Sequence, residues 1–456
     1  MIQEVIMEKF LNHFWGKEVD FKKEAIAGVT TFLAMAYIIA VNPSILSVTG
    51  MDAGALVTAT CLTAGIITIF MGLYANLPFA LASGMGLNAY FAFTVCGQKG
   101  ISWQIALTAV FVEGIIFILL SLFKVREAVV KAIPLNLKYA VTVGIGLFIA
   151  FIGFVDAGVV AKDESTLVTI GKFATPTIAV ASIGLILIVI LERKRVKGAI
   201  LWGILGATAV AWSYAALDPA GAKFFNIALP NGIVKFESIA PIAGKLDFSY
   251  AFHPQNIVNF FVVVFTFLFV DFFDTLGTLV GVSAKAGMLD KDGNVPHAGR
   301  ALLVDAIGTT AGAALGVSTV TTYVESATGV AEGGRTGFTA IITGLLFLAA
   351  MFFSPLFVAI PKCATAPALI YVGYLMMESI VKINFSDVTE AVPAFLTIIL
   401  MPLTYSIGDG LTVGVLSYVI INLILNLFTK EKKKISFVMF ILAVVFIFKL
   451  IVIPFL

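Results

Sequence analysis

The stretch FVDFFDTLGT, residues 269–278, places two acids inside a long apolar segment of the chain. Asp271, Asp274, Thr275 and Thr278 recur at spacings of three and four, so they share one face of a helix whose other faces are Phe, Leu and Val. An ionised Asp at the centre of a membrane helix costs roughly 2.5 to 3.5 kcal/mol on insertion scales. Acids kept at such depth indicate a polar pathway, which is typical of a transporter.

A third buried acid follows a different signal in STVTTYVESATG, residues 318–329. The β-branched run before Tyr323 disfavours helix and favours an extended strand, so Glu325 is expected in the first turn of a half-helix. A third segment, LPFALASGMGLN at 77–88, places one proline and two glycines before Asn88. Transporters place such breaks around the substrate, because irregular backbone at membrane depth must be covered by protein or a water-filled cavity.

The composition of the chain excludes a soluble globule. With 60% hydrophobic residues, 12% charged residues and a mean hydropathy of +1.05 over 456 residues, it lacks the polar surface that such a protein needs. The three cysteines have neither the spacing of a metal site nor that of a disulfide framework. Residues 1–24 are charged and amphipathic without a signal-peptide cleavage site, so we expect a multi-pass protein with a cytoplasmic N-terminus.

Apolar runs of about 20 residues, long enough to cross a bilayer, recur on both sides of a polar interval. They lie at 25–47, 54–75, 80–96, 101–122, 133–155, 173–191 and 199–217, then at 257–283, 299–317, 318–332, 336–354, 360–380, 388–406 and 411–428. A last run, 436–456, is either an extra span or an interfacial helix. Most of the 29 Lys and Arg residues fall in alternate loops, as the positive-inside rule requires. Because each half has an odd number of spans, the second enters the membrane in the opposite sense, which predicts an inverted repeat.

Several polar residues also have a purely structural interpretation. Asn88 could act as an interhelical hydrogen-bond donor, and Glu113, deep in an apolar segment, is either a packing acid or a proton-coupling group. Asp305 is expected to be structural, paired with Arg300 or Lys285. The three histidines lie outside the spans, so carboxylates must carry any buried proton relay.

The spacing of Asp271 and Asp274 also resembles the metal-binding acids of intramembrane prenyltransferases. Those enzymes need a second acidic cluster to hold magnesium and pyrophosphate, whereas Glu325 stands alone among Thr and Val. We therefore expect no metal, no cofactor and no enzyme activity, and an intramembrane magnesium-dependent enzyme is a remote alternative.

Three longer motifs, GMGLNAYF (84–91), FFDTLGTL (272–279) and TTYVESATGVAEGGRTG (321–337), closely resemble those of the AzgA-like purine permeases, a branch of the nucleobase:cation symporters. The resemblance extends over nearly the whole chain. It implies an all-α polytopic fold of fourteen spans, a seven-plus-seven inverted repeat like that of uracil permease, with short strands in the third and tenth spans.

The same resemblance implies a core domain that carries the substrate and a gate domain against which it moves. We expect a cytoplasmic N-terminus at 1–24, the core domain at 25–122 and 257–354, the gate domain at 123–217 and 355–428, an extracellular connection at 218–256, and a basic loop with a C-terminal hydrophobic segment at 429–456.

The substrate-binding positions that the resemblance implies are Asn88, Asp271, Glu325 and Asp274. Asp271 is the stronger match to a substrate contact, whereas Asp274 is expected to position its neighbours or the proton. Proton-coupling candidates are Asp271, Glu325 and Glu113, because a carboxyl group that gains a proton changes from acceptor to donor. The expected walls of the purine slot are Tyr90, Phe91, Phe272 and Tyr323.

The expected function is import of a purine nucleobase by proton symport, with an elevator-type mechanism in the plasma membrane. An ionised Glu325 favours guanine and hypoxanthine, which present N1–H; an adenine-preferring permease is the alternative within the family. An anion transporter of the same fold is disfavoured because the acids would repel an anion. We expect the coupled ion to be a proton rather than sodium. We expect no nucleic acid partner, and a homodimer is possible.

Overall fold

The computed structural model describes residues 19–122, 134–253, 255–285, 288, 295, 297–428 and 432–451. The first half contains α2 (Phe21–Met35), α3 (Ile38–Leu46), α4 (Ala53–Phe70), β1 (Leu81–Ser83), α5 (Met85–Ala89), the π-helical η3 (Tyr90–Gln98), α6 (Trp103–Leu122), α8 (Leu135–Ala157), β2 (Val160–Asp163), β3 (Leu167–Ile170), α9 (Pro176–Arg193), α10 (Ala199–Leu217) and α11 (Pro219–Phe224). The second half contains α12 (Ser249–Phe252), α13 (Ile257–Lys285), α14 (Ala298–Leu315), β4 (Val320–Thr322), α15 (Ser326–Ala331), α16 (Gly337–Ala350), α17 (Ser354–Val358), α18 (Lys362–Met377), α19 (Val388–Leu403), α20 (Ile407–Phe428) and α21 (Phe437–Ile451).

Within the described residues, eight helical segments are long and apolar enough to cross a membrane. Three shorter apolar helical segments lie at Ile257–Asp271, Gly337–Ala350 and Val388–Leu403. The chain is thus a helical polytopic membrane protein, and the count of fourteen spans stays a prediction. The last predicted run, 436–456, contains α21, which packs against α20 and α13; residues 452–456 lie outside the described part.

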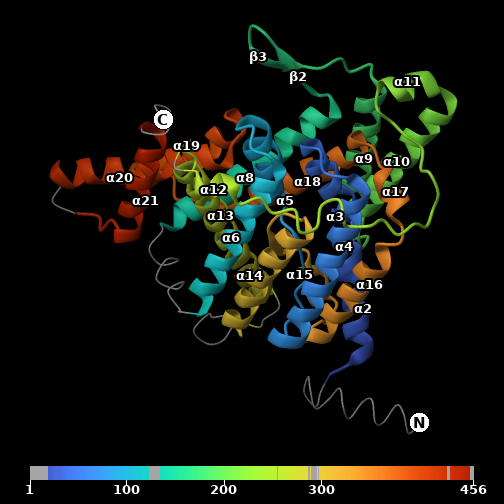
Figure 1. Ribbon diagram of the computed structural model, residues 1–456, viewed down its shortest axis with the longest axis horizontal. Helices are drawn as coiled ribbons and strands as arrows, with labels where there is room; N and C mark the ends of the chain where they lie inside the picture. The colour runs from blue at the N-terminus through green and yellow to red at the C-terminus, as the bar shows by residue number, and fades with distance from the viewer. Residues whose placement is uncertain are drawn as a thin grey trace.

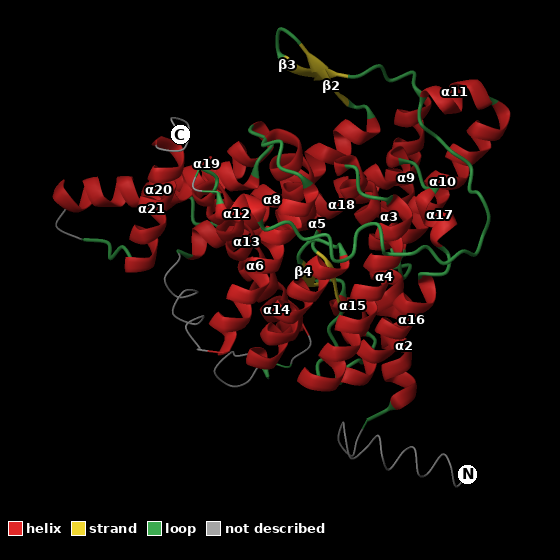
Figure 2. Ribbon diagram, viewed as in Figure 1, coloured by secondary structure: helices red, strands yellow, loops and turns green. Residues whose placement is uncertain are grey.

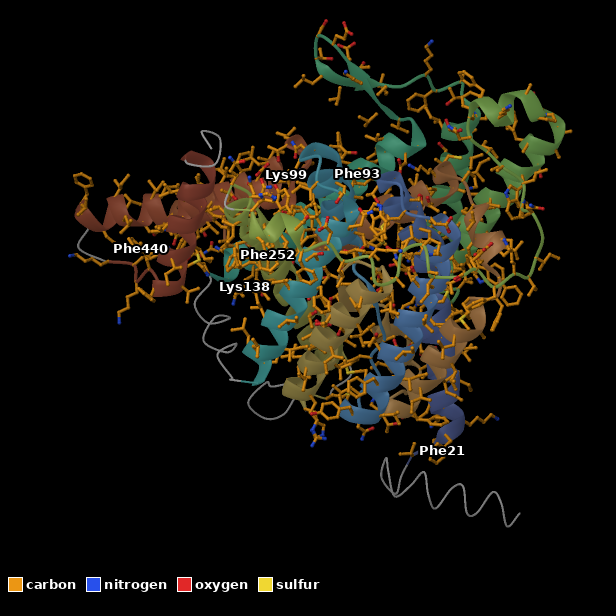
Figure 3. All side chains as sticks on the ribbon, in the orientation of Figure 1. Phe21, Phe93, Lys99, Lys138, Phe252 and Phe440 are labelled. Atoms are coloured by element: carbon orange, nitrogen blue, oxygen red, sulfur yellow. The ribbon has the colours of Figure 1, made fainter. Side chains whose placement is uncertain are left out.

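The helices pack in two groups. In the first group, α16 contacts both α2 and α4, and α6, α13 and α14 contact one another; strands β1 and β4 also belong to this group. In the second group, α8 packs against α18 and α19, and α9 packs against α10 and α18. Figure 1 shows α20 and α21 at one end of the molecule and α10 and α11 at the other. Phe21, at the start of α2, and Lys99, just after η3, lie on opposite sides of the bundle (Figure 3).

The second group depends on a backbone contact between α8 and α18. A Cβ atom added to Gly373 would lie 2.4 Å from the carbonyl oxygen of Gly146, and one added to Gly146 would lie 2.8 Å from that of Gly373. Only glycine at both positions lets the two helices approach so closely.

The two halves of the chain meet at a two-stranded ladder inside the first group. β1 pairs antiparallel with β4, with Leu81 opposite Thr322 and Ser83 opposite Val320. Every residue of both strands is buried, and β4 lies in the interior among the helices (Figure 2). Each strand precedes a short helix, α5 after β1 and α15 after β4, so two half-helices start beside the ladder.

Side chains complete the hydrogen bonding of this buried, non-helical backbone. The Thr68 hydroxyl accepts a hydrogen bond from Leu81 N at 2.9 Å, and the Ser326 hydroxyl accepts one from Ala80 N at 3.0 Å. An unpaired backbone group at this depth would be costly, because lipid offers no hydrogen-bond partner. The ladder and these caps therefore make the two breaks compatible with a membrane interior.

A hairpin that the sequence did not predict projects from the second group (Figure 1). Its strands β2 and β3 pair Val160 with Ile170 and Asp163 with Leu167. The Asp163 carboxylate accepts hydrogen bonds from the backbone amides of Ser165 and Thr166, which lowers its pKa. The available signal was the sequence DEST between two β-branched runs, a typical turn composition.

Glu24 joins the start of α16 to α2, a role that the sequence analysis missed. Its buried carboxylate accepts hydrogen bonds from the amide of Arg335 at 2.9 Å, the amide of Thr336 at 3.2 Å and the hydroxyl of Thr339 at 2.5 Å. The Arg335 guanidinium in turn donates to the carbonyl of Val330 at 2.5 Å. The motif at 332–337 is therefore held by an acid more than 300 residues away.

We expect Glu24→Ala to lower the thermal stability of the folded protein in detergent. The substitution leaves the amides of Arg335 and Thr336 without their acceptor, while the Thr339 hydroxyl keeps the backbone carbonyl of residue 24. Each buried unsatisfied group costs about 1 to 3 kcal/mol. Thermal melting of the purified variant, followed by size-exclusion chromatography, measures the effect. Glu164→Ala, an exposed acid in the hairpin turn, is the control; equal melting temperatures for the two variants would contradict the role of Glu24.

Candidate functional site

Glu325 lies just after β4, immediately before the first residue of α15. The hydroxyl of Tyr37 donates a hydrogen bond to Glu325 Oε1 at 2.5 Å. Tyr37 itself is fully buried in the short break between α2 and α3, whereas Glu325 is half-buried. The phenol therefore fixes the orientation of a carboxylate that is still accessible. No sequence signal identified Tyr37, because neither proline nor glycine marks that break.

Asp274 on α13 is half-buried and faces the same region as Glu325. It lies beside the Thr321 hydroxyl of β4 and within electrostatic range of Glu325. Tyr323 is within range of both acids, and its hydroxyl donates to the carbonyl of Ser83 on β1 at 2.5 Å. Asp274, Glu325, Tyr37 and Tyr323 thus form one polar cluster at the ladder, which we call the Asp274–Glu325 site.

Asp271, one turn before Asp274 on α13, has different neighbours. It is fully buried, and the Thr309 hydroxyl of α14 lies 3.4 Å from Asp271 Oδ2. Glu113 on α6 is also fully buried and faces Asp271. Asp271 therefore points toward the contact between α6, α13 and α14, whereas Asp274 points toward β4 and α15.

Asp305 lies in the interior of the first group. Its carboxylate accepts a hydrogen bond from Thr275 at 2.9 Å and one from Thr322 at 3.4 Å. The expected partner Arg300 places its guanidinium 5.7 Å from the ring centroid of Tyr74, and the side chain of Lys285, the other expected partner, lies outside the described residues. Asp305 thus links α13, α14 and β4.

Asn88 is fully buried in a chain of polar side chains. Its amide nitrogen donates to Asn42 Oδ1 at 2.6 Å, and its amide oxygen accepts from the hydroxyl of Ser83 at 2.8 Å. Asn42 in turn donates to Thr60 at 2.7 Å. These contacts give Asn88 the interhelical hydrogen bonds of the structural interpretation, and they connect β1 and α5 to α3 and α4.

The predicted aromatic walls divide between two environments. Tyr323 belongs to the Asp274–Glu325 site, whereas Tyr90 packs edge to face on Phe267 with ring centroids 5.0 Å apart. Phe91 also contacts Phe267, at 6.4 Å, and both residues are buried. The side chain of Phe272 lies outside the described residues.

An ion pair connects the two helix groups. Lys197, in the loop between α9 and α10, lies 2.9 Å from Glu332 at the end of α15. Both side chains are more than one third exposed, so the pair contributes only about 0 to 1 kcal/mol. It is a weak contact between elements that belong to different groups.

Sequence comparison matches the chain to a known family. The sequence model of the Permease family, for xanthine and uracil permeases, matches residues 22–413. A putative permease of Methanocaldococcus jannaschii, MJ0326, is 46% identical over 98% of both chains. The guanine/hypoxanthine permease PbuG of Bacillus subtilis is 45% identical over 88% of this chain and 90% of its own length. The adenine permease AdeP of Escherichia coli is 41% identical over 94% of this chain and 93% of its own.

Solved structures share the fold at low sequence identity. The transmembrane domain of the cyanobacterial bicarbonate transporter BicA has a TM-score of 0.66 and 14% identity, over 86% of this chain and 98% of that domain. SLC26A9 has a TM-score of 0.63 and 11% identity, over 93% of this chain and 69% of its own. The helices of this chain are therefore arranged as in these two transporters.

Proposed function

Because this chain belongs to the xanthine/uracil permease family and is a permease rather than an enzyme, we propose that it imports a purine nucleobase across the plasma membrane by proton symport. Guanine/hypoxanthine permeases and adenine permeases both occur among its relatives. The observation that carries the proposal is the Asp274–Glu325 site, where two half-buried acids and two phenols converge beside the ends of two half-helices.

The chemistry of the site favours an oxopurine. Tyr37 already donates to Glu325 Oε1, so the carboxylate is held as an acceptor, and the acceptor sites that remain on its two oxygens can meet the base. Guanine presents N1–H and its amine side by side, and a carboxylate can accept both. Adenine presents an acceptor at N1, which needs a donor in this place. An anion is disfavoured here because two carboxylates would repel it.

The geometry supports a division of roles opposite to the one that the family resemblance suggested. Asp274 is the half-buried acid that shares a cluster with Glu325, whereas Asp271 is fully enclosed between α6 and α14. A base that contacts Glu325 would therefore meet Asp274 first. We assign Asp274 and Glu325 to the purine, Asp271 and Glu113 to the proton, and Asn88 to the support of β1.

Reciprocal helix contacts support the fourteen-span inverted repeat. If α2 corresponds to α13, α4 to α14 and α6 to α16, then the contact of α2 with α16 has its counterpart in that of α13 with α6. The contact of α4 with α16 likewise corresponds to that of α14 with α6. In the second group, the pair α9 and α10 matches the pair α19 and α20.

The two helix groups correspond to the core and gate domains of the proposed elevator mechanism. The first group carries the Asp274–Glu325 site and would move, while the second would provide the fixed surface. The pair Lys197–Glu332 joins the two groups, so this movement would break it. Its small energy makes such a break inexpensive.

Cells that lack their own purine permeases should accumulate radiolabelled guanine and hypoxanthine when they express this protein. Accumulation should saturate with substrate concentration and collapse when a protonophore dissipates the proton gradient, because only carboxylates are available to couple the two fluxes. Adenine, uracil and sulfate, tested in parallel, define the specificity. Uptake driven by sodium at constant pH and insensitive to the protonophore would refute proton coupling, and preferential sulfate uptake would refute the purine site.

A further inference from the structure

A buried acid behind β4 has no use in purine recognition. Glu113 on α6 is fully buried and faces the carboxyl group of Asp271; among the described residues, neither of its carboxyl oxygens has a hydroxyl or amide donor beside it. An ionised carboxylate in this state would be extremely unfavourable, whereas a protonated carboxyl group is neutral. Within the described residues, the ionisable groups that interact with Glu113 are both acids: Asp305 on α14 through its charge, and Asp271 on α13 through a side-chain contact. We call Glu113, Asp271 and Asp305 the rear acid set. Because their negative charges would repel one another, a proton shared among them is favourable.

Two threonines connect the rear acid set to the purine site. The Thr275 hydroxyl lies 2.9 Å from Asp305 Oδ2 and also 2.9 Å from the Thr321 hydroxyl. The Thr321 hydroxyl in turn faces Asp274. Side-chain contacts therefore connect Asp305 to Asp274 through β4. The two hydroxyl groups between these acids belong to Thr275 and Thr321.

The number of protons on these four side chains decides which group donates in each hydrogen bond between them. Each hydroxyl donates only one hydrogen bond, so two threonines cannot supply the three contacts between four groups. A third proton must come from a carboxyl group. When Asp305 carries it, Thr275 can donate to Thr321 and Thr321 to Asp274, which stabilises Asp274 as an ionised acceptor. When Asp305 is ionised, Thr275 donates to it instead. The single proton of Thr321 then cannot serve both Thr275 and Asp274, so one of these two contacts is lost and the connection between the two acids is broken.

We propose that the coupled proton binds to the rear acid set, apart from the purine, and that the Thr275–Thr321 pair transmits its arrival to Asp274. The inference rests on the proposed function and extends it: a proton at the rear favours an ionised Asp274, which in turn favours the N–H groups of a purine. By linkage, bound purine raises the affinity of the rear acid set for its proton to the same degree.

Two variants in proteoliposomes test this separation of the proton from the purine. Glu113→Gln removes the buried acid and Thr275→Val removes the connecting hydroxyl, while neither residue belongs to the Asp274–Glu325 site as defined above. Both variants should still exchange internal for external guanine at equal pH, but should lose the accumulation that an inward proton gradient drives in the wild type. Thr208→Val is the matched control, because its buried hydroxyl donates to the carbonyl of Ile204 in its own helix; it should keep both activities.

The results separate this inference from the proposed function. If Glu113→Gln and Thr275→Val accumulate guanine as the wild type does, the rear acid set does not couple the proton. If Glu113→Gln fails to insert, Thr275→Val alone decides. If the wild type transports no purine, the proposed function fails, and infrared spectra of the purified protein then test the proton site by itself: a protonated-carboxyl band present in the wild type and absent from Glu113→Gln supports it, and unchanged bands refute it.

Discussion

Glu325→Gln should bind guanine more weakly than the wild type by about 1.5 to 3 kcal/mol, the range for a hydrogen bond to a charged group, which is roughly a 10- to 150-fold loss of affinity. The substitution keeps the shape of the side chain but replaces one acceptor oxygen by a donor, so it cannot accept both N1–H and the amine. It also removes the charge that the Tyr37 hydroxyl now supports.

Equilibrium binding of radiolabelled guanine to protein purified in detergent measures this loss. Tyr37→Phe should show a smaller loss, because it removes the group that orients Glu325 and leaves the acceptor in place. Glu164→Gln, in the exposed hairpin turn, controls for the loss of a negative charge. Wild-type affinity in correctly folded Glu325→Gln would remove Glu325 from the site.

The substitutions Asp274→Asn and Asp271→Asn should have opposite effects. Asp274→Asn should abolish measurable guanine binding, because it replaces the second carboxylate of the Asp274–Glu325 site. Asp271→Asn should still bind and exchange guanine, but it should lose accumulation driven by a proton gradient, because Asp271 lies with Glu113 behind the strands. Binding in detergent and transport in proteoliposomes, measured on both variants, separate the two effects.

The family resemblance favours the reverse assignment, so this pair of variants discriminates between the two. Normal guanine binding by Asp274→Asn together with its loss in Asp271→Asn would restore Asp271 as the substrate contact. Each variant serves as the control for the other, since both remove one negative charge from the same helix without changing the size of the side chain.

The sequence was sufficient to locate the buried acids and the breaks in the helices. Intramembrane carboxylates are rare because burying their charge is costly, so they stand out in the sequence. β-branched residues, glycine and proline affect the local backbone, so the breaks in the helices can also be predicted without a structure. The family was equally accessible, since the motifs around Asn88, Asp274 and Glu325 are long. Helix pairs and their contacts depend on distant residues and could not be obtained in this way.

The different environments of Asp271 and Asp274 illustrate this limit. Three residues of an α-helix turn the chain by 300°, so the two side chains point about 60° apart. That angle is small enough to place them on one face in a pattern analysis. It is large enough to direct Asp271 toward α6 and α14 and Asp274 toward β4. Only the packing of those elements decides which acid faces which neighbour.

Long-range polar partners were hidden for a related reason. Tyr37 and Glu325 are 288 residues apart, and Glu24 and Arg335 are 311 apart. A single tyrosine or glutamate in an amphipathic segment carries no local signal of such a partner. The threonine partners of Asp305 were hidden in the same way, because they lie on other elements.

The ladder between β1 and β4 also constrains how the protein is made. Ser326, whose hydroxyl caps the amide of Ala80, follows it by 246 residues, which at 5 to 20 residues per second corresponds to roughly 12 to 50 seconds of translation. During that interval β1 has been synthesised but its partner strand has not, and its unpaired amides cannot be left facing lipid. The nascent first half must therefore wait in a sheltered, hydrated setting, such as the insertion machinery, until the second half supplies the missing strand.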